Sequence, residues 1–314
     1  MGDQLNLFSD APRNIDPGEQ ILEPIMLDKN KDQARTASEL VPLNSRFFVT
    51  QKYDITENLL GRLLRVIQET KEDKLSRKEI SSILTIPNKR IDGLSAFATK
   101  AELITTNNYL TSFGSLALNL DPYLLNYGLL WFIHYLVVSN AQLILWSRLF
   151  NSVFYQVDEI KSSDVMLYFS DAQGTMNEKN YQKTGRDELK SVLSTYTDGL
   201  FKPLGLLYRS NDRKYMVITD EFPIPPAVWL ASILAYRDRY YPGAVSLETG
   251  LLVEAHFSPG RLFRQNETRV RQMLDRMHNL GLLTVERGLG LDQVRFKREF
   301  TWLSAIAQHL QEAK

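Results

Sequence analysis

The sequence predicts a mainly α-helical protein with short β-hairpins (α+β), arranged as tandem winged helix-turn-helix units around a helical hub. One observation is a layout that occurs three times, in which a helical stretch and a small apolar cluster precede a polar-tipped hairpin pattern, at residues 101–111, 203–218 and 280–296. The other is the apolar stretch 115–156, whose helical segments are hydrophobic nearly all round and therefore predict a buried hub. Helices followed by such a hairpin are typical of the winged unit, which most often places a helix in a DNA groove and a wing on the backbone.

Length and composition narrow the class of protein. The chain has 314 residues, enough for two or three cooperating domains, and 44% of them are hydrophobic. It contains no cysteine, which excludes disulfides, thiolate metal sites and cysteine nucleophiles, so in any sulfur chemistry a partner must carry the sulfur. No apolar run reaches the ~18–20 residues of a membrane span, and no signal-peptide pattern is visible. We therefore expect a cytoplasmic protein that makes no membrane contact.

The charges balance overall but are unevenly distributed. The chain has 37 basic and 37 acidic residues. Residues 1–40 hold eight acids and four bases, whereas residues 260–300 hold nine bases and five acids. An acidic front and a basic back indicate an anionic ligand site near the C-terminal end.

Residues 1–43 predict a flexible acidic arm, because they contain four prolines and no sustained hydrophobic periodicity. The pentapeptide Gln4-Leu5-Asn6-Leu7-Phe8 resembles the motif by which bacterial DNA-processing proteins dock on the replication sliding clamp. In that motif the glutamine hydrogen-bonds at a rim and the apolar side chains fill a pocket. The candidate clamp-binding residues are Gln4, Leu5, Leu7 and Phe8. An ordinary tail that matches by chance is the alternative.

Residues 44–114 predict the N-terminal winged helix. A helix capped by Thr56 and a short helix that Ser76 starts with a capping box precede a third helix over residues 88–100. This third helix is the candidate recognition helix, and the first turn of such a helix reaches base edges or phosphates. Its candidate DNA-binding residues are Lys89, Arg90 and Lys100. The alternative is a winged fold that contacts only protein and whose charges are merely solvated.

Residues 115–222 predict the helical hub together with the second hairpin. A polar loop over 170–184 separates the hub from a helix that we expect from about Arg186 to Tyr196. His134 lies among the aromatic residues of the hub, and no nearby pair of ligands gives metal spacing. A lone histidine in such surroundings is more often a core residue than a catalytic group.

Residues 223–314 predict the C-terminal winged helix. Helices are expected over 227–240, over 246–256 and, capped by Asn266, over 267–279, before the third hairpin. The basic residues of this unit make it the better DNA-binding candidate of the two. They are Arg261 and Arg264 before the last helix, Arg269 and Arg276 on one side of it, and Arg271 off that line. The alternative is a surface helix with internal salt bridges.

The residues give no nuclease constellation. Hydrolysis of a phosphodiester usually requires carboxylates that hold divalent cations, or an activated nucleophile. Asp158, Glu159 and Asp164 lie close together, but neither their number nor their spacing is diagnostic of a metal site. We therefore assign no catalytic residue and no metal ligand. Mg²⁺ or Mn²⁺ would be the cofactor only if the protein cuts DNA.

The hub and the flanking hairpins resemble the signature of the SspB-like family, bacterial proteins encoded beside DNA phosphorothioation genes. The resemblance covers residues 44–300 and is carried by long motifs in a fixed order. These motifs are Tyr109-Leu110-Thr111-Ser112-Phe113-Gly114, Asp121-Pro122-Tyr123, Leu130-Trp131-Phe132-Ile133-His134, Leu149-Phe150-Asn151 and Pro203-Leu204-Gly205-Leu206.

The resemblance implies a DNA-binding component of a phosphorothioate-modification system that defends against phage. Family members work with a cysteine desulfurase, an ATPase and a sulfur-transfer enzyme, and the SspB-like component is expected to bind double-stranded DNA and to nick one strand. The sequence leaves two alternatives open. One is a non-enzymatic winged-helix regulator that binds an operator as a dimer, which would make the protein a homo-oligomer. The other is a scaffold whose wings bind the partner enzymes.

Overall fold

A computed structural model gives the fold of the chain. It describes residues 49–70, 75–161, 165–166, 168–169, 177–210, 214–218, 222–288 and 290–313. These residues all belong to one compact unit. The predicted acidic arm, with the candidate clamp-binding residues Gln4, Leu5, Leu7 and Phe8, lies outside the described residues.

Three helices open the described chain, and local signals set their limits. They are α1 (Glu57–Glu69), α2 (Arg77–Leu84) and α3 (Asn88–Lys100). The Thr56 hydroxyl caps α1, and Ser76 forms the predicted capping box with Glu79 at the start of α2. The hairpin predicted at 101–111 is reduced to one β-bridge, between Ile104 and Leu110. It ends there because the next residue, Thr111, already caps the following helix.

The apolar stretch forms the buried hub that the sequence predicts. Its helices are α4 (Ser112–Leu120), α5 (Tyr127–Val138), α6 (Ile144–Arg148) and α7 (Phe154–Gln156), with a π-helical turn over Leu149–Val153 between the last two. Every residue of α5 from Gly128 to Val138 is buried, so this helix is surrounded by other elements on all sides.

A small central sheet and one long helix follow the hub. The sheet is antiparallel, in the order β1-β3-β2, and consists of β1 (Glu159–Lys161), β2 (Leu207–Arg209) and β3 (Lys214–Val217). The long helix α9 spans Glu178–Thr197 and therefore begins eight residues before the predicted start at Arg186. Gly185 does not end the helix because it is buried within it, as is Tyr181 one turn earlier, and packing of an apolar face outweighs local propensity.

The C-terminal part combines helices with a second three-stranded sheet. Its elements are α10 (Pro226–Tyr240), β4 (Ser246–Glu248), α11 (Thr249–Val253), α12 (Pro259–Leu262), α13 (Glu267–Asn279), β5 (Leu283–Gly288), β6 (Leu291–Phe296) and α14 (Trp302–Glu312). The sheet order is β4-β6-β5, all antiparallel. The helix predicted over 246–256 is wrong at both ends, since Leu247 lies in a strand opposite Val294 of β6 and α11 ends at Val253.

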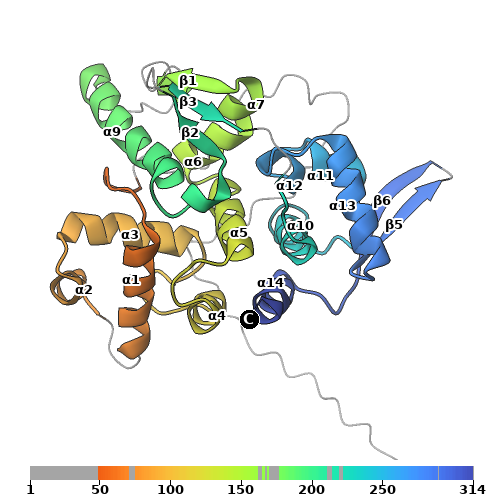
Figure 1. Ribbon diagram of the computed structural model, residues 1–314, viewed down its shortest axis with the longest axis horizontal. Coiled ribbons are helices and arrows are strands. Elements are labelled where there is room, and N and C mark those ends of the chain that lie inside the picture. The colour runs from red at the N-terminus through yellow and green to blue at the C-terminus, as the bar shows by residue number, and fades with distance from the viewer. Residues whose placement is uncertain are drawn as a thin grey trace, which may run out of the picture. The chain divides into compact units, whose positions relative to one another are not determined.

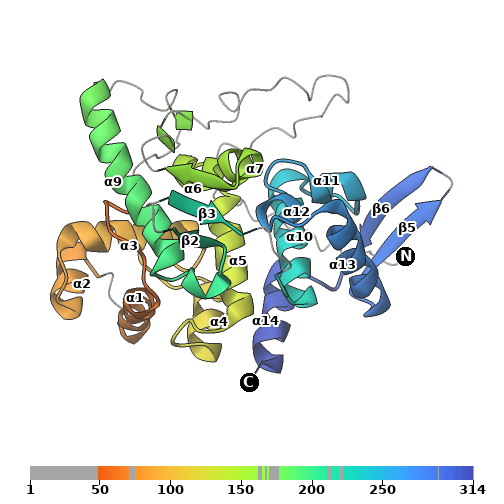
Figure 2. The ribbon, with the colours of Figure 1, turned by 45° about the horizontal axis from the view of Figure 1, so that its top comes forward.

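The helices on the two sides of α5 belong to different parts of the chain. In both ribbon views α9 and α3 lie on one side of α5, and α13 with the β5–β6 hairpin lies on the other (Figures 1 and 2). The described residues are thus mainly helical with two small antiparallel sheets, as the sequence predicts at that level. None of the helices in the described ranges is long and apolar enough to cross a membrane.

Candidate nucleic-acid interface

The cations of α3 do not gather at one place. Lys89 is exposed in the first turn. The Arg90 guanidinium is half-buried, 5.4 Å from the centre of the Tyr53 ring and 3.6 Å from the Asp54 carboxylate. At the other end of the helix, the Lys100 ammonium donates to the Gln142 side chain. Of the three candidate residues of α3, only Lys89 is therefore exposed, and it lies in the first turn of the helix.

A strained turn joins this region to α9. Gln51 and Lys52 both have positive φ angles, 54° and 70°, although neither is glycine. The buried Glu188 carboxylate of α9 accepts hydrogen bonds from the backbone N–H groups of Val49 (2.7 Å), Thr50 (2.5 Å) and Lys52 (3.1 Å). Such a backbone conformation persists only where the surroundings over-determine it. Glu188 supplies that constraint and fixes the segment before α1 against α9.

Helix α13 presents two of the predicted arginines along one sector. Asn266 caps the helix, as predicted, and Val270, Leu274 and Met277 point inward. Arg269, Gln272 and Arg276 are spaced by three and four residues, so they share a sector of the helix away from that core. The Arg269 guanidinium donates to Gln272 at 3.3 Å. Arginine and an amide on one outward helical sector are the donors and acceptors that read base edges in a major groove.

The third predicted arginine of α13 is held within the fold. The Arg271 guanidinium makes two hydrogen bonds to the Asp292 carboxylate of β6, at 2.7 and 3.1 Å, and one to Glu267 at 2.8 Å. These bonds raise the pKa of Arg271 and lower that of Asp292. Arg287 of β5 pairs in turn with Asp275 of α13 at 2.9 Å. The hairpin is therefore joined to the helix by ion pairs at two points.

Arg261 and Arg264 also serve the fold rather than a ligand surface. The Arg261 guanidinium donates to the carbonyls of Asn151 and Glu254 and lies 3.8 Å from the centre of the Tyr155 ring. The Arg264 guanidinium donates to the Phe154 carbonyl and, at 2.9 Å, to the Asp158 carboxylate. Burial lowers the pKa of both arginines. Both side chains satisfy carbonyls at the end of the hub helices, where the helix has no partners of its own.

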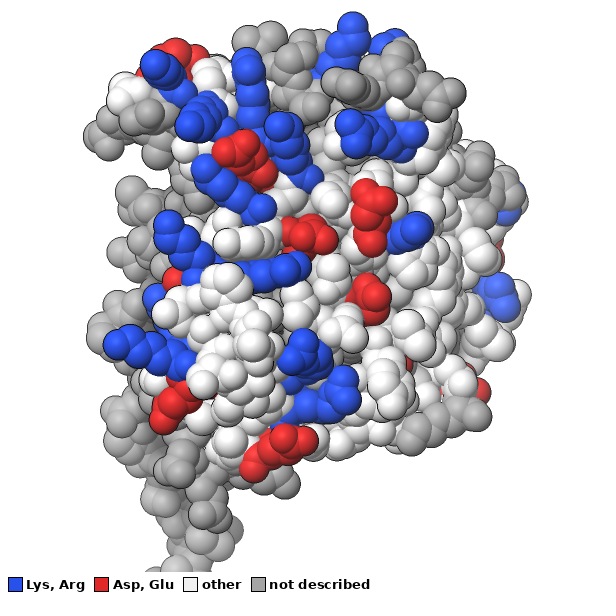
Figure 3. Space-filling view, turned by 60° about the vertical axis from the view of Figure 1, so that its left-hand side comes forward, with Lys and Arg blue, Asp and Glu red and all other residues white. Residues whose placement is uncertain are grey.

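The structure adds a basic stripe on α9 that the sequence analysis missed. It consists of Lys179, Lys183, Arg186 and Lys190, all exposed and spaced by four, three and four residues. None of the four forms an ion pair or hydrogen bond with any residue in the described ranges. The space-filling view of the side formed by α2, α3 and α9 shows Lys and Arg gathered over its upper part, where α9 lies (Figure 3). The spacing is visible in the sequence, but half of the stripe falls in the segment predicted to be a loop.

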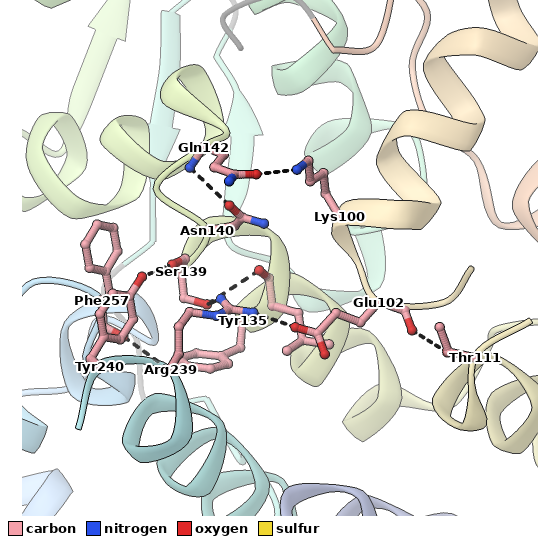
Figure 4. Close-up of polar contacts among 11 residues, drawn as sticks. Lys100, Glu102, Thr111, Tyr135, Ser139, Asn140, Gln142, Arg239, Tyr240 and Phe257 are labelled. Carbon is pink, nitrogen blue, oxygen red and sulfur yellow. Dashed lines mark hydrogen bonds and ion pairs between the residues drawn. The ribbon is translucent and has the colours of Figure 1, made fainter. Parts of the chain in front are cut away.

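A polar network ties the two sides of the molecule together. The Arg239 guanidinium of α10 donates to Glu102, which follows α3, at 2.5 Å, and to the Ser139 hydroxyl at the end of α5, at 2.9 Å (Figure 4). The Tyr240 hydroxyl donates to the Ser139 carbonyl, and the Tyr135 hydroxyl donates to the Phe257 carbonyl at 3.2 Å. Because α3, α5 and α10 share these bonds, the helices on both sides of the hub keep a fixed relation to one another.

No arrangement of catalytic groups emerges from the described residues. His134 is fully buried, its Nδ1 lies 2.7 Å from the Tyr196 hydroxyl, and burial lowers its pKa to about 3. Asp158 and Glu159 are paired with Arg264 and Lys214. Within the described ranges, no group of three or more His, Asp or Glu side chains is placed to hold a metal ion. The described residues therefore assign no particular reaction to the protein.

Comparisons with known proteins identify a family and a fold. The model of a family described as a protein of unknown function (DUF4007) matches residues 94–311. A crystal structure of magnesium ion-bound SspB has a TM-score of 0.70 at 15% identity, over 89% of this chain and 90% of that one. A second SspB crystal structure has a TM-score of 0.69 at 15% identity, over 88% and 89%. No curated protein matches. The predicted resemblance to SspB is confirmed as a likeness of fold.

Proposed function

The chain belongs to the DUF4007 family of proteins of unknown function, and from this premise and its SspB-like fold we propose that it is a DNA-binding component of a phosphorothioate-modification system. In this proposal the protein is cytoplasmic and binds double-stranded DNA for the enzymes that install sulfur, as part of phage defence. The absence of cysteine from the sequence agrees with that division of work, because a partner must then carry the sulfur.

The observation that carries the proposal is the geometry of α13 and its hairpin. The order β4-α11-α12-α13-β5-β6, with β4 pairing β6, is typical of a winged helix, and α13 takes the place of the recognition helix. Arg269, Gln272 and Arg276 share one sector, while Arg271 and Asp292 hold the hairpin to the helix. A fixed wing beside a helix with outward polar groups is pre-organised for a groove and its backbone.

The N-terminal helices form the second, smaller winged unit of the proposal. Helices α1 to α3 and the single bridge between Ile104 and Leu110 give it a very short wing. Lys89 is the cation of α3 that would reach the backbone, since Arg90 and Lys100 have partners within the fold. We assign this unit a minor share of DNA affinity and a larger share of contact with the desulfurase, the ATPase and the sulfur-transfer enzyme.

The test is a comparison of two double variants in duplex binding. Replacing Arg269 and Arg276 by alanine removes two cations that would neutralise phosphates and should weaken binding of a random-sequence duplex by roughly one to two orders of magnitude at ~0.1 M salt. The matched control replaces Lys297 and Arg298, which follow β6 at the base of the hairpin, and removes the same charge from the same part of the chain. Equal affinities of the two variants would refute the role of α13.

Nicking is tested separately on supercoiled plasmid. The protein is incubated with Mg²⁺ or Mn²⁺, alone and with its partner enzymes, and conversion to relaxed circles is measured. Relaxed circles would make the protein a nickase with a divalent cation as cofactor. Binding to duplex DNA without relaxation under either cation would leave a binding component that does not cut.

A further inference from the structure

We infer that α9 carries a second contact surface for the sugar–phosphate backbone of duplex DNA, formed by Lys179, Lys183, Arg186 and Lys190. This inference rests on the proposed function, that the protein binds duplex DNA, and it adds a place of contact that lies away from α13. In both ribbon views the two helices are separated by α5 (Figures 1 and 2).

The first step is the alignment of the four side chains. Spacings of four, three and four residues place them within a narrow sector of the helix, over a length of about 16 Å at ~1.5 Å per residue. The opposite side of the same helix is buried and includes Leu189, Val192 and Tyr196. A rigid helix packed along its length therefore presents a straight row of four cations.

The second step is that acids do not neutralise the row. Of the three acids on α9, Glu188 is buried and accepts backbone N–H groups, and Asp187 pairs with Lys52 at 2.9 Å. Glu178 accepts a hydrogen bond from Gln182. Exposed charges on an ordinary helix face usually alternate in sign and pair at i,i+4. The row on α9 departs from that pattern, which is expected where a ligand supplies the negative charge.

The third step is the position of the cations along the helix. Lys179 lies in the first turn of α9, where the helix macrodipole disfavours positive charge. The position of Lys179 thus lowers the stability of the helix slightly. A bound phosphate would reverse the sign of this interaction, because an anion is favoured at a helix N-terminus.

The chemistry of the surface favours duplex DNA over a single strand. Proteins that bind single strands stack bases on exposed aromatic side chains. The two aromatic residues of α9, Tyr181 and Tyr196, are fully buried. Because α9 itself offers no exposed aromatic side chain for stacking, its row of cations would contact phosphates, which is the pattern of sequence-independent backbone binding.

The same surface is poorly suited to a protein partner. Interfaces between proteins are centred on buried aromatic or aliphatic anchors. Among the described residues, the large hydrophobic side chains that are exposed do not include any from α9. We therefore favour the DNA backbone, and an acidic protein surface becomes one outcome of the test.

The experiment measures how the affinity for a long random-sequence duplex depends on salt. The α9 variant replaces Lys183 and Arg186 by glutamine, which keeps helix propensity and, because both side chains are exposed, should leave the thermal unfolding midpoint unchanged. We expect the slope of log Kobs against log salt to become shallower by about 1.8, or ~0.9 for each phosphate that the variant no longer neutralises. The control is the glutamine version of the pair at Lys297 and Arg298, which should change the slope little.

Two comparisons separate the failure of this inference from the failure of the proposed function. An unchanged slope for the α9 variant, together with weakened binding by the variant at Arg269 and Arg276, would overturn the inference and leave the proposed function standing. If the unmodified protein does not bind duplex DNA, both are overturned. If the α9 variant retains duplex binding but loses binding to polyglutamate, the surface belongs to an acidic protein and the inference is wrong.

Discussion

Helices α9 and α13 both carry basic side chains, but they use them differently. On α13 the fold itself occupies Arg271, which holds the hairpin through Asp292, whereas Arg276 is exposed in the outward sector and Arg269 donates to Gln272 in the same sector. On α9 the four cations of the stripe have no partner in the described part of the chain. A count of arginines in the sequence therefore includes residues that the fold occupies near α13 and omits the exposed lysines of α9.

The difference also concerns shape. Ion pairs hold α13 and the hairpin in one fixed arrangement, and a protein that recognises base edges needs side chains in fixed positions. The stripe on α9 is straight and made only of charge, so it would hold a backbone without regard to sequence. We therefore expect specificity to depend on α13 and general affinity to depend on both helices.

The largest effect on stability is expected at the contact between α3 and the segment that precedes α1. A Cβ atom added at Gly93 of α3 would lie 2.3 Å from the Thr50 carbonyl oxygen, in the segment that Glu188 of α9 holds. Gly93→Ala should lower the free energy of unfolding by about 2–3 kcal/mol, because neither backbone can move away cheaply. Chemical denaturation measures the change.

A matched glycine lies on the other side of the hub. A Cβ atom added at Gly250 of α11 meets nothing within 4 Å. Gly250→Ala should be neutral or stabilise by up to about 1 kcal/mol, as alanine is favoured over glycine within a helix. Equal losses in the two variants would mean that the α3–α9 side is not more tightly built than the C-terminal side.

A pH effect of intermediate size on stability should come from His134, which contacts residues of both α9 and α12. His134 contacts Tyr196 of α9 and lies 3.5 Å from the Leu262 carbonyl of α12, and burial holds its pKa at about 3. The unfolded chain binds this proton near pH 6.5, so stability is full above that pH and falls as the pH drops toward 3, by up to about 1.4 kcal/mol per pH unit.

The variant His134→Phe should flatten this dependence. Part of the slope will remain, since burial also lowers the pKa of His256, to about 4. Urea unfolding at pH 7 and pH 5 gives the two free energies for each protein. An unchanged difference between the two pH values in the variant would show that His134 does not titrate as a buried group.

A smaller loss of stability is expected when the contact between α13 and the β5–β6 hairpin is weakened. Asp292→Asn removes the carboxylate that accepts two of the three hydrogen bonds of Arg271. Since both side chains are partly exposed, the loss of stability should be about 1 kcal/mol or less. Discrimination between DNA sequences should suffer more than general affinity, because the variant leaves only the Arg287–Asp275 ion pair between hairpin and helix but removes no cation. A proportional loss on all sequences would contradict the distinction between the two helices.

The smallest changes in stability are expected from new charges near the ends of α9 and α13, where they interact with the helix dipoles. Lys179→Glu places an acid in the first turn of α9 and should stabilise the protein by about 0.3–1 kcal/mol, whereas Arg276→Glu places an acid in the last turn of α13 and should destabilise it by a similar amount. Both substitutions should weaken duplex binding. Thermal unfolding at low salt measures the stabilities, and shifts of the same sign would contradict the dipole argument.

Local signals in the sequence predicted those parts of the fold that local interactions determine. The caps at Thr56, Ser76 and Asn266 fixed the starts of α1, α2 and α13. The start of α9 was missed because its first two turns are polar and contain Gly185, and their stability comes from packing of Tyr181. Strand β4 was missed because its partner, β6, lies more than 40 residues away along the chain.

In the candidate site, too, local spacing could be predicted from the sequence, whereas long-range contacts could not. The sector with Arg269 and Arg276 follows from helical spacing alone. The roles of Arg261 and Arg264 did not follow, because the Asn151 and Phe154 carbonyls that they bind lie 110 residues earlier in the sequence. The pairing of Arg271 with Asp292 likewise depends on how the hairpin folds back on the helix.

The most direct test is photo-crosslinking from three glutamine positions to duplex DNA. A photoreactive residue is placed at Gln272 on α13, at Gln182 beside the stripe on α9, and at the exposed Gln308 on α14. We predict adducts with DNA from the first two positions and none from the third. Equal yields at all three positions, or no adduct from position 272, would contradict the claim that the protein binds DNA through these helices.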